Sequence, residues 1–271
     1  TNASFHQPGG ITSDGTNLYV VDGDNHKIRK VVIATGAVTT FAGSTEGSTN
    51  AAGTAAKFSI PQGITTDGTN LYVGDTNNHL IRKIVISTGV VSTIAGYPGS
   101  AGSTDGTGTS ARFTYPRGIA TDGTNLYVVD SLGHKIRKIV ISTGVVTTLA
   151  GSNNGFADGT GTAAKFSYPH GITIDGTNLY VADGNNHRIR KIVISTGAVT
   201  TFAGSSQGFA NATGTAAKFY SPIGIDTDGT NFYVADAGND LIRKIVISTG
   251  VVTTIACLLY TSDAADEEDS V

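Results

Sequence analysis

The sequence contains no tryptophan and no methionine, and Cys257 is its single cysteine. One cysteine excludes intrachain disulfides and cysteine-based zinc sites. No run approaches 18 apolar residues, so we predict no membrane-spanning helix and no membrane insertion. A chain without methionine also lacks an initiator residue, and we therefore expect a processed or truncated product of a longer protein.

Charge is scarce as well, because charged residues make up 14% of the chain against roughly 25% in an ordinary domain. The formal net charge of −3 depends on five acidic residues that lie among residues 261–271. Without those five, 16 acidic and 18 basic residues leave a body of about +2. A body so close to neutrality has no electrostatic footprint for nucleic acid, and we expect no nucleic-acid partner.

Repetition is what the sequence has in abundance. The dipeptide Gly-Ile recurs five times, at spacings of 53, 55, 53 and 53 residues. In the fourth copy, residues 171–174, 179–182, 189–194 and 198–203 form apolar runs separated by turns rich in Asp, Gly, Asn and Ser. Three short turns between four such runs predict an up-and-down meander of four strands.

The inner runs are apolar at consecutive positions, which is typical of strands that are covered on both faces. Four-stranded sheets covered by copies of themselves predict an all-β fold, a β-propeller of five four-stranded antiparallel blades within residues 1–256. WD-type and kelch-type propellers are disfavoured because both signatures depend on tryptophan. The predicted blades span about residues 9–43, 62–96, 117–151, 170–204 and 223–256.

The repeated runs also resemble a known family. The second copy reads Gly-Ile-Thr-Thr-Asp at 63–67, Leu-Tyr-Val-Gly-Asp at 71–75 and Asn-His-Leu-Ile-Arg at 78–82. This pattern resembles the NHL repeat, and all five copies follow it across residues 5–256. The resemblance implies an NHL-type propeller and a parent protein with six or more blades, of which this chain would be a fragment. We expect the five blades to close into a ring or to dimerise, because an open apolar end face forfeits free energy.

Long linkers rich in Gly, Ser and Thr join the blades at 43–62, 96–117, 151–170 and 204–223. Each ends near an Ala-Ala-Lys-Phe or Ala-Arg-Phe sequence, and Thr54 is expected to cap one helical turn there. The phenylalanine of each linker is expected to pin it onto the blades. These residues are Phe58, Phe113, Phe166 and Phe219.

The repeat pattern breaks at Cys257 and does not resume. Residues 257–267 resemble the conceptual translation of a transposon-based sequencing adapter, and a native acidic tail is the alternative. We expect residues 257–271 to be non-native or disordered.

Four sets of polar residues recur in the blades, and each has a structural interpretation beside a functional one. An aspartate ends every second strand, and a further aspartate opens every first turn; we favour hydrogen bonds to backbone N–H groups of their own turns over a calcium ring. Four histidines lie at the second turn of their blades. We favour turn or inter-blade hydrogen bonds for them over a metal site, because one histidine per blade would spread them around the ring. For the five strand arginines we favour ion pairs with carboxylates of a neighbouring blade, or a position on a solvent-exposed strand edge. The strand-end aspartates are Asp22, Asp75, Asp130, Asp183 and Asp236.

One position differs sharply between the repeats, and it lies between a proline and the Gly-Ile strand. In a propeller the first strand lines the central channel, so this position should lie at the channel mouth. Polar residues that differ from repeat to repeat at this position indicate a ligand pocket. The alternative is sequence drift without function in a solvent-exposed loop. The candidate ligand-binding residues are Gln62, Arg117, His170 and Asp226, with Tyr115 and Tyr168 beside them.

No nucleophile elbow and no clustered metal-ligand set is present, so we expect no enzyme activity, no metal and no cofactor. The function we favour is a non-catalytic ligand- or protein-binding scaffold module of a larger, extracellular or cell-surface protein. Its partner would be a protein, small molecule or glycan on the face that carries the linkers. The alternative is a metal-dependent lyase or hydrolase with its site at the channel mouth.

Overall fold

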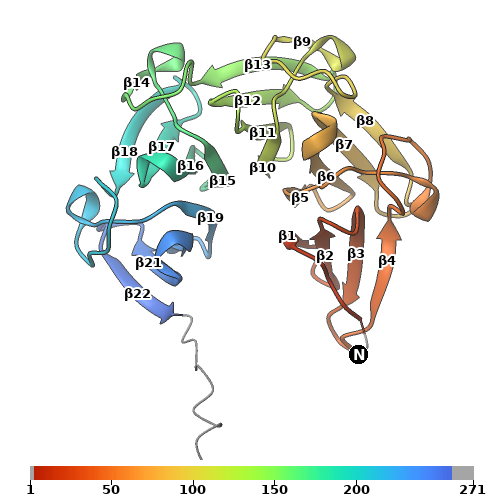
Figure 1. The fold of residues 1–271 in the computed structure, drawn as a ribbon, viewed down its shortest axis with the longest axis horizontal. Helices are drawn as coiled ribbons and strands as arrows, with labels where there is room; N and C mark the ends of the chain where they lie inside the picture. Colours follow the sequence, from red (N-terminus) through yellow and green to blue (C-terminus); the bar gives the residue numbers. More distant parts are fainter. Residues whose placement is uncertain (1–2, 258–271) are drawn as a thin grey trace, which may run out of the picture.

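The computed structural model describes residues 3–257, and this part of the chain is an all-β propeller of five blades (Figure 1). Every blade contains four antiparallel strands that pair in chain order, as the meander pattern predicts. Short linker strands β9 (Gly106–Thr107) and β14 (Gly159–Thr160) add a fifth strand to the third and fourth blades. No helix in this described part is long and apolar enough to cross a membrane.

Each blade is built from four strands whose bounds are as follows. Blade 1 comprises β1 (Pro8–Ser13), β2 (Asn17–Asp22), β3 (Lys27–Val32) and β4 (Val38–Ala42). Blade 2 comprises β5 (Ile64–Thr66), β6 (Asn70–Asp75), β7 (Leu80–Val85) and β8 (Val91–Ala95). Blade 3 comprises β10 (Pro116–Thr121), β11 (Asn125–Asp130), β12 (Lys135–Val140) and β13 (Val145–Ala150). Blade 4 comprises β15 (Pro169–Ile174), β16 (Asn178–Asp183), β17 (Arg188–Val193) and β18 (Ala198–Ala203). Blade 5 comprises β19 (Pro222–Thr227), β20 (Asn231–Asp236), β21 (Leu241–Val246) and β22 (Val252–Cys257).

The first turn of each blade is held by its aspartate, as expected. Asp67 accepts hydrogen bonds from the backbone N–H groups of Thr69 and Asn70 at 2.8 and 2.6 Å. The hydroxyl of Tyr72 donates to the same carboxylate at 2.8 Å. Such a side chain replaces the missing backbone partners of a tight turn, which explains why the residue recurs in every blade.

Residues 3–257 also contain seven single 3₁₀ turns, four in the linkers and three in the second turns of the blades. The linker turns are η1 (Gly53–Ala55), η3 (Gly108–Ser110), η4 (Gly161–Ala163) and η6 (Gly214–Ala216). The second-turn elements are η2 (Thr76–Asn78), η5 (Gly184–Asn186) and η7 (Ala237–Asn239). The expectation that Thr54 caps a helical turn is wrong, because the turn begins at Gly53 after Ala52 and has no side-chain cap. The prediction for the four linker phenylalanines is confirmed, since all are fully buried.

The hydrophobic core lies between successive blades. Tyr19, Val21 and Ile28 on one face of blade 1 pack against Leu71, Val73 and Ile84 on the facing side of blade 2, with Phe58 of the linker between them. The same arrangement recurs at the other interfaces between successive blades. Each blade therefore buries both faces only when it has a neighbour on each side.

The five blades form an open arc, and the expectation that they close into a ring is wrong for this structure. Figure 1 shows a gap between β1 and β19, whereas the inner strands of successive blades are in contact. The same packing repeats at every interface and sets the angle between blades, and five copies of that angle do not complete a circle. The two end faces are consequently exposed: Ile11 is 56% exposed against 6% for Ile119, and Ile242 is 40% exposed against 0% for Ile189.

Strand β22 runs through Cys257, one residue beyond the expected end of the last blade. The thiol of Cys257 is free and the residue is exposed. The rest of the tail that resembles an adapter lies outside the described residues.

Candidate functional site at the channel mouth

The local backbone at the start of each inner strand presents the variable residue to the channel. In blade 3, Pro116 pairs with Asp130 and Ile119 pairs with Val128, so a β-bulge leaves Arg117 between them out of the ladder. A bulge redirects the side chain that it contains. The residue before the proline, Tyr115, has a φ of 56°, which turns the chain sharply into the strand.

Glycines bring neighbouring inner strands together backbone to backbone. A Cβ on Gly63 would lie 2.0 Å from the carbonyl oxygen of Arg117, and one on Gly118 would lie 2.4 Å from that of His170. Only glycine permits this approach. The variable residues of successive repeats, 53 to 55 positions apart in the chain, are therefore neighbours around the mouth.

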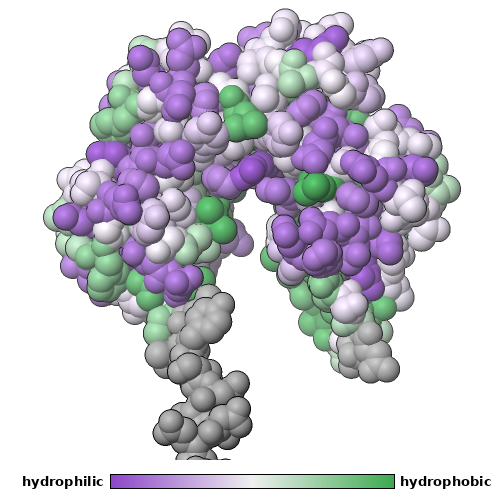
Figure 2. Space-filling model, viewed as in Figure 1, coloured by the Kyte–Doolittle hydropathy of each residue, from purple (hydrophilic) through white to green (hydrophobic). Residues whose placement is uncertain are grey.

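These residues line a cavity of about 310 Å³ at the mouth. Gln62, Arg117 and His170 belong to its wall, together with Ile223 and Asp24. It opens onto a channel of about 840 Å³ whose walls are the five inner strands, and Asp226 lies there. Figure 2 shows the molecule hollowed at its centre, with hydrophilic residues gathered at the inner edge. The structure thus brings three of the six sequence-predicted residues into one cavity and places a fourth deeper in the channel.

Arg117 and His170 contact each other directly. Nη1 of Arg117 lies 2.7 Å from Nδ1 and 2.9 Å from Nε2 of His170, so the guanidinium donates to the imidazole ring. Burial, and secondly the charge of Arg117, lowers the pKa of His170 to about 4. His170 is therefore neutral at physiological pH and accepts a hydrogen bond from a half-buried cation.

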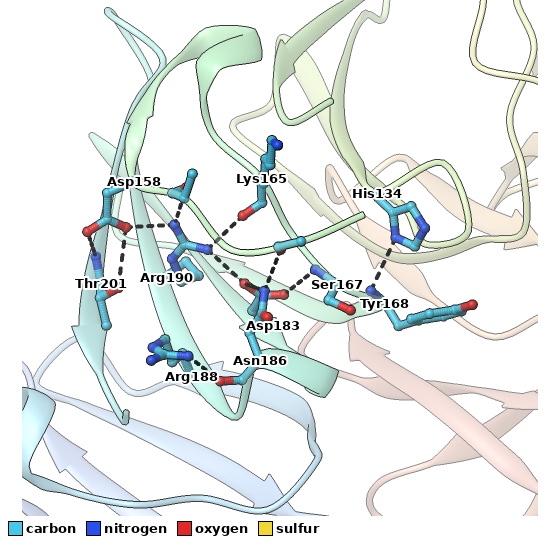
Figure 3. Close-up of polar contacts among 12 residues, drawn as sticks. His134, Asp158, Lys165, Ser167, Tyr168, Asp183, Asn186, Arg188, Arg190 and Thr201 are labelled. Carbon is cyan, nitrogen blue, oxygen red and sulfur yellow. Dashed lines mark hydrogen bonds and ion pairs between the residues drawn. The ribbon is translucent and has the colours of Figure 1, made fainter. Parts of the chain in front are cut away.

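Tyr115 and Tyr168 lie elsewhere, and neither lines the mouth cavity or the channel. The backbone N–H of Tyr115 donates to Nδ1 of His79 at 3.3 Å, and the two rings meet edge to face at 5.0 Å. Tyr168 makes the same contacts with His134 (Figure 3). Their side chains cover the histidine of the preceding blade, and a ligand-binding role for them stays a prediction.

These contacts confirm the inter-blade interpretation of the histidines. His26, His79, His134 and His187 each accept a hydrogen bond from a backbone N–H at the start of the next blade. In residues 3–257 no three His, Cys, Asp or Glu side chains lie together in a way that could hold a metal ion.

The strand-end aspartates and the strand arginines form one buried network in each blade. Figure 3 shows it in blade 4, where Nη1 of Arg190 lies 2.8 Å from Oδ2 of Asp183. Asp183 also accepts from the backbone N–H of Ser167 at 2.8 Å and from Asn186 at 2.9 Å. Two expectations need correction. The backbone donor comes from the linker rather than from the aspartate's own turn, and the arginine pairs within its blade rather than between blades.

The sequence interpretation missed two kinds of residue. Asp105 and Asp158 in the linkers pair with Nη2 of Arg137 and Arg190, at 2.7 and 2.6 Å. Their signal was a fixed spacing of 32 residues before each arginine. Asp24, on the wall of the mouth cavity, was also missed. Its repeat position also varies, with four residue types in five repeats, and this was the signal that could have found it.

Comparison with known proteins agrees with the repeat pattern. A model of the NHL repeat matches residues 166–192. The chain is 28% identical to the chloroplastic protein SUPPRESSOR OF QUENCHING 1 of Arabidopsis thaliana, over 95% of this chain and 26% of that protein. It is 27% identical to NHL repeat-containing protein 2 of Homo sapiens, over 94% of this chain and 41% of that protein. The chain therefore spans less than half the length of these relatives.

Solved structures share the fold at lower identity. A chain in the crystal structure of a nidogen/laminin complex superposes with a TM-score of 0.66 at 17% identity, over 91% of this chain and 80% of that chain. Streptogramin B lyase superposes with a TM-score of 0.59 at 15% identity, over 95% of this chain and 71% of that chain. At these identities the likeness concerns the fold alone.

Proposed function

Because the chain is an NHL-repeat β-propeller, we propose that it serves as a non-catalytic binding module whose ligand site is the channel mouth. The observation that supports this proposal is the cavity formed by Gln62, Arg117, His170 and Ile223. These four residues occupy one repeat position yet share no chemistry. A structural position repeats its residue, as the buried Asp–Arg pairs do, whereas a recognition surface uses differences between repeats.

The proposal includes the setting that the composition suggests, an extracellular or cell-surface protein of which this propeller is one part. It also includes a second type of partner. Tyr97, Phe156 and Phe209 are 52%, 46% and 55% exposed on the linkers and stack on arginine side chains. Exposed aromatic residues beside arginine are frequent in protein interfaces. A protein partner would therefore contact this linker-bearing surface, while a small molecule or glycan would enter the mouth.

The alternative is a metal-dependent lyase or hydrolase with its site at the same mouth. It requires a set of ligands for the metal, and His170 is the only histidine of the cavity wall among the described residues. Metal analysis of the purified protein, with and without the substitution His170→Ala, tests this alternative. If the unsubstituted protein contained stoichiometric metal and the His170→Ala variant did not, the result would favour the enzyme over the binding module.

Methyl-resolved NMR of isoleucine-labelled protein tests the binding site. Ile223 lies in the cavity wall, whereas Ile255 lies on β22 at the open end face and serves as the control reporter. A panel of small molecules, monosaccharides and short peptides is expected to contain compounds that shift the Ile223 methyl signal saturably and leave the Ile255 signal unchanged. Some ligands could bind without shifting the Ile223 signal, or could lose affinity when Phe156 and Phe209 are replaced by serine. Either result would indicate that the binding site lies on the linker surface instead.

A further inference from the structure

Arg117 differs from the other arginines in what it binds. The chain has eight arginines, and seven of them donate to a carboxylate or carbonyl oxygen. Among the described residues, the guanidinium of Arg117 forms hydrogen bonds only with the ring of His170. Neutral imidazole satisfies one donor but carries no negative charge. A half-buried guanidinium without a counter-charge is costly, because its desolvation is not offset by an ion pair.

Arg117 has one donor group, Nη2, available at the mouth. Its Nε is buried without a partner, while Nη2 has no partner in residues 3–257 and is not among the buried atoms. The side-chain amide of Gln62, in the same wall, makes no hydrogen bond to another described residue either. A free cationic donor and a free amide therefore face one cavity.

The acidic residues nearby do not form an ion pair with Arg117. Asp24 lines the same cavity but lies 3.6 Å from His6. Asp226 accepts hydrogen bonds from the backbone of Thr227 at 2.8 Å and from the Thr173 hydroxyl at 3.5 Å. No carboxylate of the described chain lies within ion-pairing distance of Arg117.

We propose that the channel mouth binds its ligand through an anionic group, a carboxylate or a phosphate, with Arg117 as the cationic donor. Gln62 donates a second hydrogen bond from its amide, and neutral His170 holds the guanidinium in place from the other side. The inference rests on the proposed function and specifies the chemistry of its ligand. Guanidinium binds carboxylate and phosphate with charge-assisted hydrogen bonds, which are stronger than bonds between neutral groups.

NMR of protein labelled with ¹⁵N-arginine tests this proposal. The Nε–Hε signal of Arg117 is assigned by its loss in Arg117→Gln, and the protein is titrated with acetate, with inorganic phosphate and with chloride at equal ionic strength. We expect acetate or phosphate to shift this signal and the Ile223 methyl signal saturably. In Arg117→Gln the shift of Ile223 should require at least about tenfold more anion. The matched control Arg112→Gln, on a linker outside the channel, should bind as the unsubstituted protein does.

The outcomes separate this inference from the proposed function. If chloride causes the same shifts, or if Arg117→Gln binds the anions unchanged, the anion site is overturned. If a neutral compound shifts Ile223 equally in both proteins, the mouth binds ligands but not through an anionic group. If no compound and no anion shifts Ile223, both proposals fail. The anion that binds more tightly identifies the class of group.

Discussion

Nη1 of Arg82 on β7 lies 2.7 Å from Oδ2 of Asp75 on the paired strand β6, and both side chains are fully buried. The guanidinium also donates to the carbonyl oxygens of Lys57 and Thr49 in the linker. This pair therefore joins the blade to the linker that enters it. Removal of one member would leave the other buried without its partner.

We predict that Arg82→Ala lowers the free energy of unfolding by about 3–5 kcal/mol, because it leaves the Asp75 carboxylate buried without its cation. Arg29→Ala in the first blade is the control, since Arg29 is 14% exposed and solvent can reach the position. Urea denaturation of both variants measures the difference. Equal losses would contradict the role of burial in the interior blades.

The second prediction concerns pH. The pKa of His170 falls to about 4 in the folded protein because of burial and the nearby Arg117, against about 6.5 in the unfolded chain. Between these values the unfolded chain binds more protons, so acidification from pH 6.5 to 4 favours unfolding. The loss attributable to this histidine is on the order of 2–3 kcal/mol. His170→Gln lacks that contribution, so its stability should fall less over the same range. Parallel curves for the two proteins would refute the assignment.

The third prediction tests the close approach of the inner strands. Gly63→Ala places a methyl group against the backbone carbonyl of Arg117 and should cost about 1–3 kcal/mol or more. Gly224→Ala is the matched control, because a Cβ there meets only the Ala235 side chain at 3.4 Å. Thermal denaturation compares the two variants. The distinction fails if Gly224→Ala is as damaging as Gly63→Ala.

The fourth prediction tests the open arc in solution. Ile119→Ala empties a buried site between blades and should cost about 2–5 kcal/mol. Ile11→Ala, at the equivalent position on the exposed end face, should cost less than about 1 kcal/mol. A large loss at Ile11, or a stability of the unsubstituted protein that rises with its concentration, would show that the end face is covered in solution.

Much of the fold could be predicted because its signals are local. Turn residues such as Asp67 and Gly68 mark where strands end, and five repetitions removed the ambiguity of any single copy. The buried pair of Asp75 and Arg82 was also accessible to sequence reasoning. Asp75 pairs with Leu80 across the hairpin, and Arg82 lies two residues further on the same face.

The sequence alone determined the blades and their order, because strand propensity and turn chemistry act over a few neighbouring residues. It also identified the variable position that contains Gln62, Arg117 and His170. Only the tertiary structure decided that the blades form an open arc, since the angle between blades arises from packing. The contact between Arg117 and His170 likewise depends on two strands that start 53 residues apart. They meet because the glycines beside them let the two backbones touch.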